Sequence, residues 1–148
     1  MKVGERAPDF TLTDQDKNEI NLTKDLLSKG GDVVLTFYPF DFSPVCTTEM
    51  QCFTGDIAKF EQKGATVVGI SCDSFFAHKA WADTLGLKTT LLADMHREVC
   101  KAYGFYFPPL NCAARGTVVI GPDGVVKWVN ARELKDAVKN DELLAAIS

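Results

Sequence analysis

Residues 33–46 have the sequence VVLTFYPFDFSPVC, and this stretch decides the fold that we expect. Its first six residues form an apolar run that predicts a buried strand over 33–38. Ser43 and Pro44 then predict the start of a helix, because serine is a favoured N-cap and proline is favoured at the first helical position. No proline interrupts the chain from there to Gln62, so we expect one helix that continues to this residue.

Cys46 occupies the third position of this expected helix. In a capping box that position carries a Glu or Gln, which reaches back to free backbone N–H groups. The unpaired N–H donors and the positive end of the helix dipole favour a thiolate there. The local sequence therefore predicts that Cys46 is a nucleophile.

The remaining segments alternate between strands and helices. We expect an N-terminal β-hairpin within 7–22, strands over 66–71 and 89–92, helices over 75–85, 95–103 and 133–147, and a hairpin that pairs 116–120 with 125–129. This order favours an α/β fold with a central mixed sheet and helices on both faces, as a single domain over residues 1–148. Sites in such sheets form beyond the carboxyl ends of strands, which is where residues 39–46 are expected.

Composition excludes several classes of function. The chain has 148 residues, of which 46% are hydrophobic and 24% charged, and its net charge is −4. A negative net charge without a basic cluster argues against a nucleic-acid partner. No apolar run reaches the length of a membrane span, and the first residues show no signal core, so we expect a cytoplasmic protein without a membrane partner.

Five cysteines are an odd number, which argues against a secreted disulfide scaffold. No pair has the C-x-x-C spacing, and neither His78 nor His96 lies near a cysteine in a ligand pattern. We therefore expect no metal and no cofactor, and we assign both histidines to surface or cap positions. Cys72 and Cys100 are expected to be buried and inert.

Pro39, Ser43 and Cys46 match the Pro-x-x-x-(Thr/Ser)-x-x-Cys motif, so the chain resembles the peroxiredoxins. The resemblance continues over nearly the whole chain, in residues 7–10, 69–74, 102–104 and 115–117. Within this family, the chain resembles above all the short one-cysteine proteins of the alkyl hydroperoxide reductase E type. This resemblance implies a thioredoxin-like fold and reduction of hydrogen peroxide and organic hydroperoxides by a cysteine thiolate.

The resemblance also implies roles for individual residues. Cys46 would attack the peroxide and become a sulfenic acid. Ser43 would hydrogen-bond the peroxide, Pro39 would shield the pocket, and Arg115 would stabilise the thiolate and the leaving oxygen. Glu49 would orient the arginine, although a surface carboxylate is the alternative.

The residue that resolves the sulfenic acid is left open by the sequence. Positions 49 and 51 hold no cysteine, and the sequence ends at Ser148, so we expect no C-terminal arm with a resolving thiol. Cys52 lies six residues after Cys46, about 9 Å along an intact helix, and would need the helix to unwind. Cys112, in an expected loop, is the other candidate. We favour an external thiol or small redoxin as reductant, with a two-cysteine mechanism through Cys52 or Cys112 as the alternative.

Three further expectations concern alternative functions, the preferred substrate and the oligomeric state. A thioredoxin-type oxidoreductase would need a second cysteine at position 49, and a non-catalytic sensor would use Cys46 without turnover. Phe40 and Phe42 are expected to form an apolar rim that favours organic hydroperoxides. The aromatic stretch 105–109 predicts an exposed patch and hence a homodimer.

Overall fold

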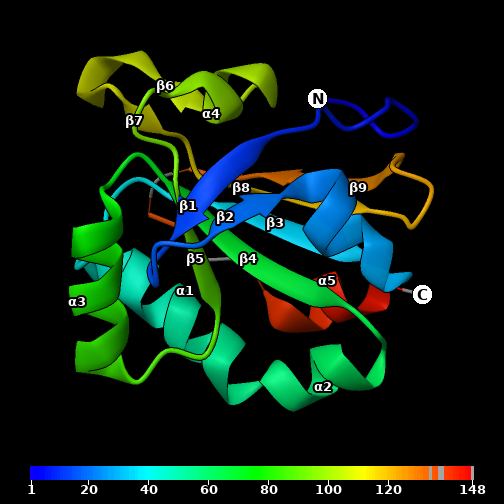
Figure 1. Ribbon diagram of the computed structural model, residues 1–148, viewed down its shortest axis with the longest axis horizontal. Helices are drawn as coiled ribbons and strands as arrows, with labels where there is room; N and C mark the ends of the chain where they lie inside the picture. The colour runs from blue at the N-terminus through cyan, green and yellow to red at the C-terminus, as the bar shows by residue number, and fades with distance from the viewer. Residues whose placement is uncertain (134, 137–138, 148) are drawn as a thin grey trace.

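A seven-stranded sheet forms the centre of the protein in the computed structural model, which describes residues 1–133, 135–136 and 139–147. The strand order is β2-β1-β5-β4-β3-β8-β9 (Figure 1). The strands are β1 Thr11–Asp14, β2 Glu19–Asn21, β3 Val33–Phe37, β4 Thr66–Ser71, β5 Thr90–Ala93, β8 Gly116–Ile120 and β9 Val126–Ala131. A separate two-stranded sheet joins β6 Tyr106–Phe107 and β7 Cys112–Ala113.

The helices follow the order predicted from the sequence. They are α1 Pro44–Gly55, α2 Ile57–Gln62, α3 Phe75–Leu85, α4 Glu98–Ala102 and α5 Asn140–Ala145, with short helical turns η1 Leu22–Leu26, η2 Leu27–Lys29 and η3 Pro108–Leu110. None of the helices in the described part of the chain is long and apolar enough to cross a membrane.

The mixed character of the sheet comes from its central strand. All five residues of β3 are buried, and β3 runs parallel to β4 and antiparallel to β8. Strand β4 also runs parallel to β5, and β1 pairs antiparallel with β2 and β5. The predicted mixed sheet and N-terminal hairpin are confirmed.

Helices cover both faces of this sheet, as predicted (Figure 1). One face packs against α1, α2, α3 and α5 through a buried cluster that includes Met50, Phe60 and Trp81. The other face packs against η1 and α4 through a second cluster that includes Leu26 and Val99. We call these the α1 face and the α4 face. That residues 1–148 fold as a single domain stays a prediction.

Three predicted helices differ from those observed. The helix expected over 44–62 is divided at Asp56, since Gly55 and Asp56 are poor helix formers and the Asp56 carboxylate accepts a hydrogen bond from Asn140.

The helix expected over 95–103 begins only at Glu98 (α4). Its start is fixed by Arg97 at φ +62° and by the Asp94 carboxylate, which accepts hydrogen bonds from the Val99 and Cys100 N–H groups.

The helix expected over 133–147 is confirmed only for α5, Asn140–Ala145. Residues 133, 135, 136 and 139 are not helical, and residues 134, 137 and 138 lie outside the described part of the chain. Arg132 explains why the helix does not begin at 133: its side chain donates to the Asp136 carbonyl and to Glu49, which ties Arg132 and Asp136 to each other beside the sheet.

Candidate active site

Helix α1 begins as the sequence predicts. Ser43 is the extended N-cap residue, with φ −72° and ψ +149°, and Pro44 is the first helical residue, so Cys46 is the third. The Ser43 hydroxyl does not cap a helical N–H; it donates to the Phe40 carbonyl at 2.9 Å instead. The Cys46 side chain is fully buried on the α1 face.

Arg115 reaches Cys46 because of how β3 and β8 pair. Phe37, at the end of β3, lies opposite Gly116, at the start of β8, so Arg115 is placed beside the loop that leads into α1. Its Nη2 donates to the Cys46 sulfur at 2.8 Å, and its side chain is almost entirely buried. The predicted pair of Cys46 and Arg115 is therefore in direct contact.

Glu49 lies one helical turn after Cys46 and is buried, so the alternative of a surface carboxylate is wrong. Its Oε2 lies 3.5 Å from Arg115 Nη1, and its Oε1 accepts a hydrogen bond from the Thr36 hydroxyl at 3.1 Å. The carboxylate thus holds the guanidinium from the side away from the thiol. Thr36 reaches it from the middle of β3.

Arg132 also belongs to this cluster, although none of the sequence motifs described above includes it. Its Nη2 lies 3.1 Å from Glu49 Oε2, and its Nη1 donates to the Thr117 hydroxyl at 3.0 Å. Its backbone N–H donates to the Arg115 carbonyl, so the two arginines are neighbours across the β8–β9 hairpin. Burial lowers the pKa of Arg132, although the Glu49 charge opposes this shift.

Strand alternation could have revealed Arg132. Side chains two residues apart on a strand point to the same face of a sheet. Trp128 packs on the α1 face, so residue 132 is expected to point to that face too, as Arg115 does opposite it. Two guanidinium groups and one carboxylate thus carry one net positive charge next to the Cys46 sulfur.

The loop between β3 and α1 is held by a buried polar network. His78 Nδ1 lies 2.7 Å from the Asp41 carboxylate, His78 Nε2 lies 3.0 Å from the Leu92 carbonyl, and the Tyr38 hydroxyl donates to Asp41 at 2.6 Å. Burial, followed by the Asp41 charge, raises the pKa of Tyr38 well above its usual value. The predicted surface or cap position of His78 is wrong, because the loop carboxylate provides a buried partner that the local sequence does not reveal. His96 is exposed, as predicted.

The other predicted site residues of this loop differ in exposure. Pro39 is buried, and Phe40 and Phe42 are exposed, which fits the expected apolar rim. In the stretch 105–109, however, Phe105 is buried against the α4 face, so the expectation of an exposed patch is wrong for this residue.

The two candidate resolving cysteines lie in different surroundings. Cys52 is exposed on the intact helix α1, whereas Cys112 is buried in β7, so the loop expected around Cys112 is in fact a short strand. Burial raises the pKa of the Cys112 thiol to about 11. All five cysteines are free thiols.

Among the residues that the structure describes, two clusters contain groups that could bind a metal. Asp41, Asp73 and His78 form one, and Cys72, Asp94 and Cys100 form the other; within each, the ligand atoms lie within 4.8 Å of one another. In the first cluster, potential ligand atoms already take part in hydrogen bonds, since Asp73 Oδ2 accepts from the Asp41 N–H and the Ser71 hydroxyl. In the second, both carboxylate oxygens of Asp94 accept backbone hydrogen bonds.

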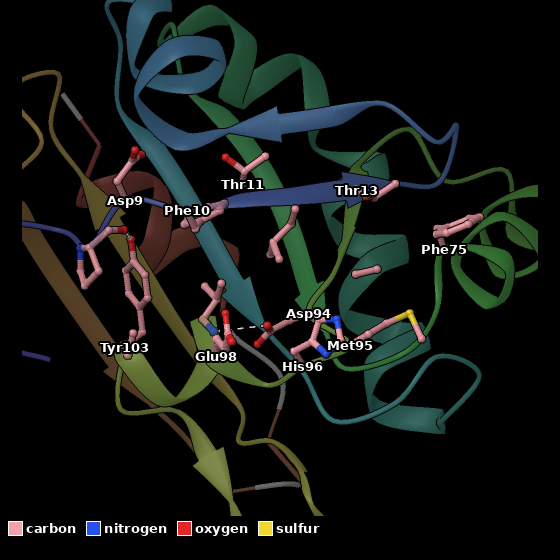
Figure 2. A pocket seen from close by; sticks show the side chains of 15 residues that line it. Asp9, Phe10, Thr11, Thr13, Phe75, Asp94, Met95, His96, Glu98 and Tyr103 are labelled. Carbon is pink, nitrogen blue, oxygen red and sulfur yellow. Dashed lines mark hydrogen bonds between the residues drawn. The ribbon is translucent and has the colours of Figure 1, made fainter.

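A surface pocket of about 430 Å³ lies apart from Cys46, Glu49 and Arg115 on the α1 face. It opens between β1 and the segment leading into α4, where Thr11, Thr13, His96 and Tyr103 line it (Figure 2). Neither Cys46 nor Arg115 lines this pocket.

Comparison with known proteins identifies the family. The profile of the AhpC/TSA family matches residues 3–129. The chain is 36% identical to peroxiredoxin-2 of Mus musculus over 99% of this chain and 77% of the relative, and 34% identical to the chloroplastic 2-Cys peroxiredoxin BAS1 of Hordeum vulgare over 98% and 73%. The chain therefore belongs to the AhpC/TSA family of peroxiredoxins.

Solved structures agree with this assignment. The crystal structure of peroxidoxin BcpB from Mycobacterium tuberculosis has a TM-score of 0.89 and 30% identity, covering 99% of this chain and 96% of that one. The reduced 2-Cys peroxiredoxin of Plasmodium vivax has a TM-score of 0.88 and 30% identity, covering 97% and 79%. The predicted thioredoxin-like fold is confirmed, and the protein is a thiol-dependent peroxidase.

Proposed function

We propose that Cys46 is the cysteine that reduces the peroxide. The observation that carries this proposal is the contact between the Cys46 sulfur and Arg115 Nη2, 2.8 Å long and buried at the first turn of α1. A cationic donor beside the sulfur supports a thiolate and can stabilise charge that develops on the departing oxygen. The sulfur of no other cysteine accepts a hydrogen bond from an arginine among the contacts of the described residues.

The reaction at Cys46 is the reduction of one peroxide molecule. The Cys46 thiolate attacks one peroxide oxygen, a sulfur–oxygen bond forms and the oxygen–oxygen bond breaks. The two electrons leave on the second oxygen, which takes up a proton and departs as water or an alcohol. Cys46 becomes a sulfenic acid.

The neighbours of Cys46 have supporting roles in this proposal. Arg115 stabilises both the thiolate and the leaving oxygen, and Glu49 orients Arg115. Ser43 hydrogen-bonds the peroxide once its hydroxyl turns from the Phe40 carbonyl. Pro39, buried beside this loop, shields the pocket from water.

An external thiol or redoxin then reduces the sulfenic acid, as in the one-cysteine alkyl hydroperoxide reductase E type. Two observations support this choice over an internal resolver. Cys52 is exposed on an intact helix while Cys46 is buried, and the raised pKa of Cys112 leaves little of its thiolate at neutral pH. The relatives named 2-Cys peroxiredoxins favour the alternative, in which Cys52 or Cys112 forms a disulfide with Cys46.

Three further attributes stay predictions. Organic hydroperoxides are the expected preference because Phe40 and Phe42 are exposed beside the loop. A homodimer is expected from the aromatic stretch 105–109, of which Pro108 and Pro109 are exposed and Phe105 is buried. A cytoplasmic location is expected from the odd number of cysteines.

Peptide mapping of the reduced protein after one equivalent of peroxide tests the mechanism. We expect dimedone to label Cys46, and turnover to depend on added thiol. A Cys46–Cys52 or Cys46–Cys112 crosslinked peptide in quantitative yield would establish the two-cysteine alternative. Absence of dimedone labelling at Cys46, together with peroxidase turnover in Cys46→Ser at the rate of the parent protein, would refute the role of Cys46 itself.

A further inference from the structure

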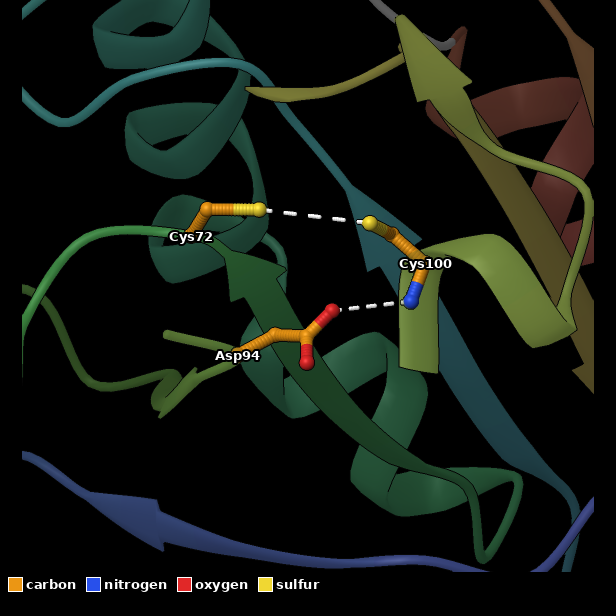
Figure 3. Close-up of side chains that lie close together, drawn as sticks. All are labelled: Cys72, Asp94 and Cys100. Atoms are coloured by element: carbon orange, nitrogen blue, oxygen red, sulfur yellow. Dashed lines mark hydrogen bonds between the residues drawn. The ribbon is translucent and has the colours of Figure 1, made fainter. Parts of the chain in front are cut away.

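Cys72 and Cys100 form a second pair of sulfur atoms, on the α4 face of the sheet. Their Sγ atoms lie 3.9 Å apart, although the residues are 28 positions apart in the chain (Figure 3). Cys72 lies in the bend just after β4, and Cys100 lies in α4. Cys46 belongs to the cluster on the α1 face, whereas Cys100 and the half-buried Cys72 pack in the cluster on the α4 face.

We propose that Cys72 and Cys100 are a second redox centre, which a hydroperoxide oxidises to an intramolecular disulfide. This inference goes beyond the proposed function of Cys46 and does not depend on it. The sequence analysis expected both cysteines to be buried and inert, but Cys72 is half-buried and therefore within reach of a small oxidant.

The distance between the sulfurs suits this chemistry. A disulfide bond is about 2.05 Å long, so the two sulfur atoms must approach by about 1.9 Å. Side-chain rotation at Cys72 can provide part of that movement, because this residue follows the end of β4 and belongs to no helix or strand. Cys100 is held more firmly, since its N–H donates to Asp94 at 2.8 Å and its sulfur lies 3.4 Å from the Arg97 carbonyl.

The surroundings of the Cys72 and Cys100 thiols differ, and this difference indicates which thiol reacts with the oxidant first. The hydrogen bond with Cys100 lowers the pKa of the Cys72 thiol, and this outweighs the opposing effect of burial. The same hydrogen bond, together with burial, raises the pKa of the Cys100 thiol. Cys72 is therefore the thiolate that meets the oxidant, and Cys100 is the thiol that follows.

The reaction balances with a hydroperoxide as the only oxidant. The Cys72 thiolate attacks a peroxide oxygen, the oxygen–oxygen bond breaks, and Cys72 becomes a sulfenic acid. The other oxygen takes up the proton that the Cys72 thiol released on ionising and leaves as water or an alcohol. The Cys100 sulfur then attacks the Cys72 sulfur, the sulfur–oxygen bond breaks, and the hydroxyl group leaves with the Cys100 proton as water. Two thiols are oxidised by two electrons, and one peroxide is reduced.

A metal site fits the same three residues less well. Both carboxylate oxygens of Asp94 already accept hydrogen bonds from the start of α4, at 3.2 and 2.8 Å. A structural zinc site needs four ligands, and the cluster consists of three residues among those described. The pair of thiols is the part of the cluster whose atoms are placed to react with each other.

The test uses the Cys46→Ser chain, which removes the proposed peroxidatic thiol and leaves the second pair intact. The reduced protein is treated with hydrogen peroxide, alkylated and mapped by mass spectrometry without reductant. We expect a crosslinked Cys72–Cys100 peptide, which dithiothreitol removes. The Cys112→Ser change in the same chain is the matched control and should keep the crosslink.

Two further variants keep the test independent of folding defects. Cys100→Ser should leave a Cys72 sulfenic acid that dimedone labels, and Cys72→Ser should leave Cys100 unoxidised. Full alkylation of both thiols after excess peroxide, or a crosslink of either one to Cys112 or Cys52, would overturn the proposal. So would retention of one zinc ion per chain after dialysis of the reduced protein, if Cys72→Ser abolishes that retention.

Discussion

The two faces of the sheet each place a cysteine beside a different kind of partner. On the α1 face, Cys46 accepts a hydrogen bond from Arg115, within a buried cluster that carries one net positive charge. On the α4 face, Cys72 lies 3.9 Å from a second thiol, Cys100, and no guanidinium contact to either sulfur is found in the described residues. A cation supports thiolate chemistry and stabilises a leaving group, whereas a neighbouring thiol turns oxidation into a disulfide.

The comparison teaches that the partner of a cysteine, more than its burial, decides its chemistry. Cys46 and Cys100 are both fully buried. Only Cys46 is expected to be a fast nucleophile toward peroxide, because only its partner is a cation.

Removing each cysteine in turn should give the largest contrast. Cys46→Ser is expected to remove the fast thiol-dependent peroxidase turnover and to leave only the slow oxidation and re-reduction of Cys72 and Cys100. Cys72→Ser is expected to leave the fast turnover unchanged, because only Cys46 contacts Arg115. Steady-state turnover with excess external thiol measures both. Loss of turnover in both variants would show that the two sulfur sites act as one.

Replacing the cation should have the next largest effect. Arg115→Gln keeps a hydrogen-bond donor but removes the charge, and we expect kcat/KM for peroxide to fall by about 10²- to 10³-fold, the range for loss of a donor to a developing oxyanion. Arg115→Lys should recover only part of the rate, because an ammonium group cannot bridge Cys46 and Glu49 as a planar guanidinium does. Rates within threefold of the parent would refute a role for this contact.

Arg132 acts one step further from the sulfur. Arg132→Gln removes a charge that touches Glu49 but not Cys46, so we expect kcat/KM to fall by about tenfold, or about 1.4 kcal/mol. Lys127→Gln is the matched control, since Lys127 lies on β9, the strand that leads into Arg132, and pairs with Asp32 at 2.8 Å. An equal loss in both variants would indicate a general defect of β9.

The smallest expected effect concerns the second pair. The hydrogen bond with Cys100 lowers the pKa of the Cys72 thiol, so the Cys72 thiolate forms at a lower pH than it would without this bond. Cys100→Ala removes this bond and should raise the pKa of Cys72, so that alkylation of Cys72 sets in at higher pH. Peptide-resolved alkylation rates between pH 6 and about 10 measure the shift, with the exposed Cys52 as internal reference. An unchanged profile would show that Cys100 does not stabilise the thiolate.

The local parts of this site could be predicted from the sequence. Ser43, Pro44 and Cys46 define a helix start within four residues, and capping rules place the thiol correctly. The strands also follow from apolar runs, because a fully buried strand such as β3 leaves a continuous signal.

The parts that depend on tertiary pairing could not be predicted in this way. His78 is buried because the Asp41 carboxylate, 37 residues away in the chain, lies opposite it. The contact between Cys72 and Cys100 joins a strand end to a helix whose start was itself mispredicted. In each case the decisive partner lies far away in the chain, and no local rule relates the two.

The length of the turn in the β8–β9 hairpin controls which face of the sheet the Arg132 side chain points to. Arg115 and Arg132 lie at its open end, and the turn over residues 121–125, with exposed Pro122 and Asp123, closes the other end. If one residue added to this turn shifted the pairing of the strands by one position, Arg132 would point to the opposite face of the sheet. An insertion in an exposed turn would then change the charge around a distant sulfur, so insertions that preserve activity must be looped out without moving the strands.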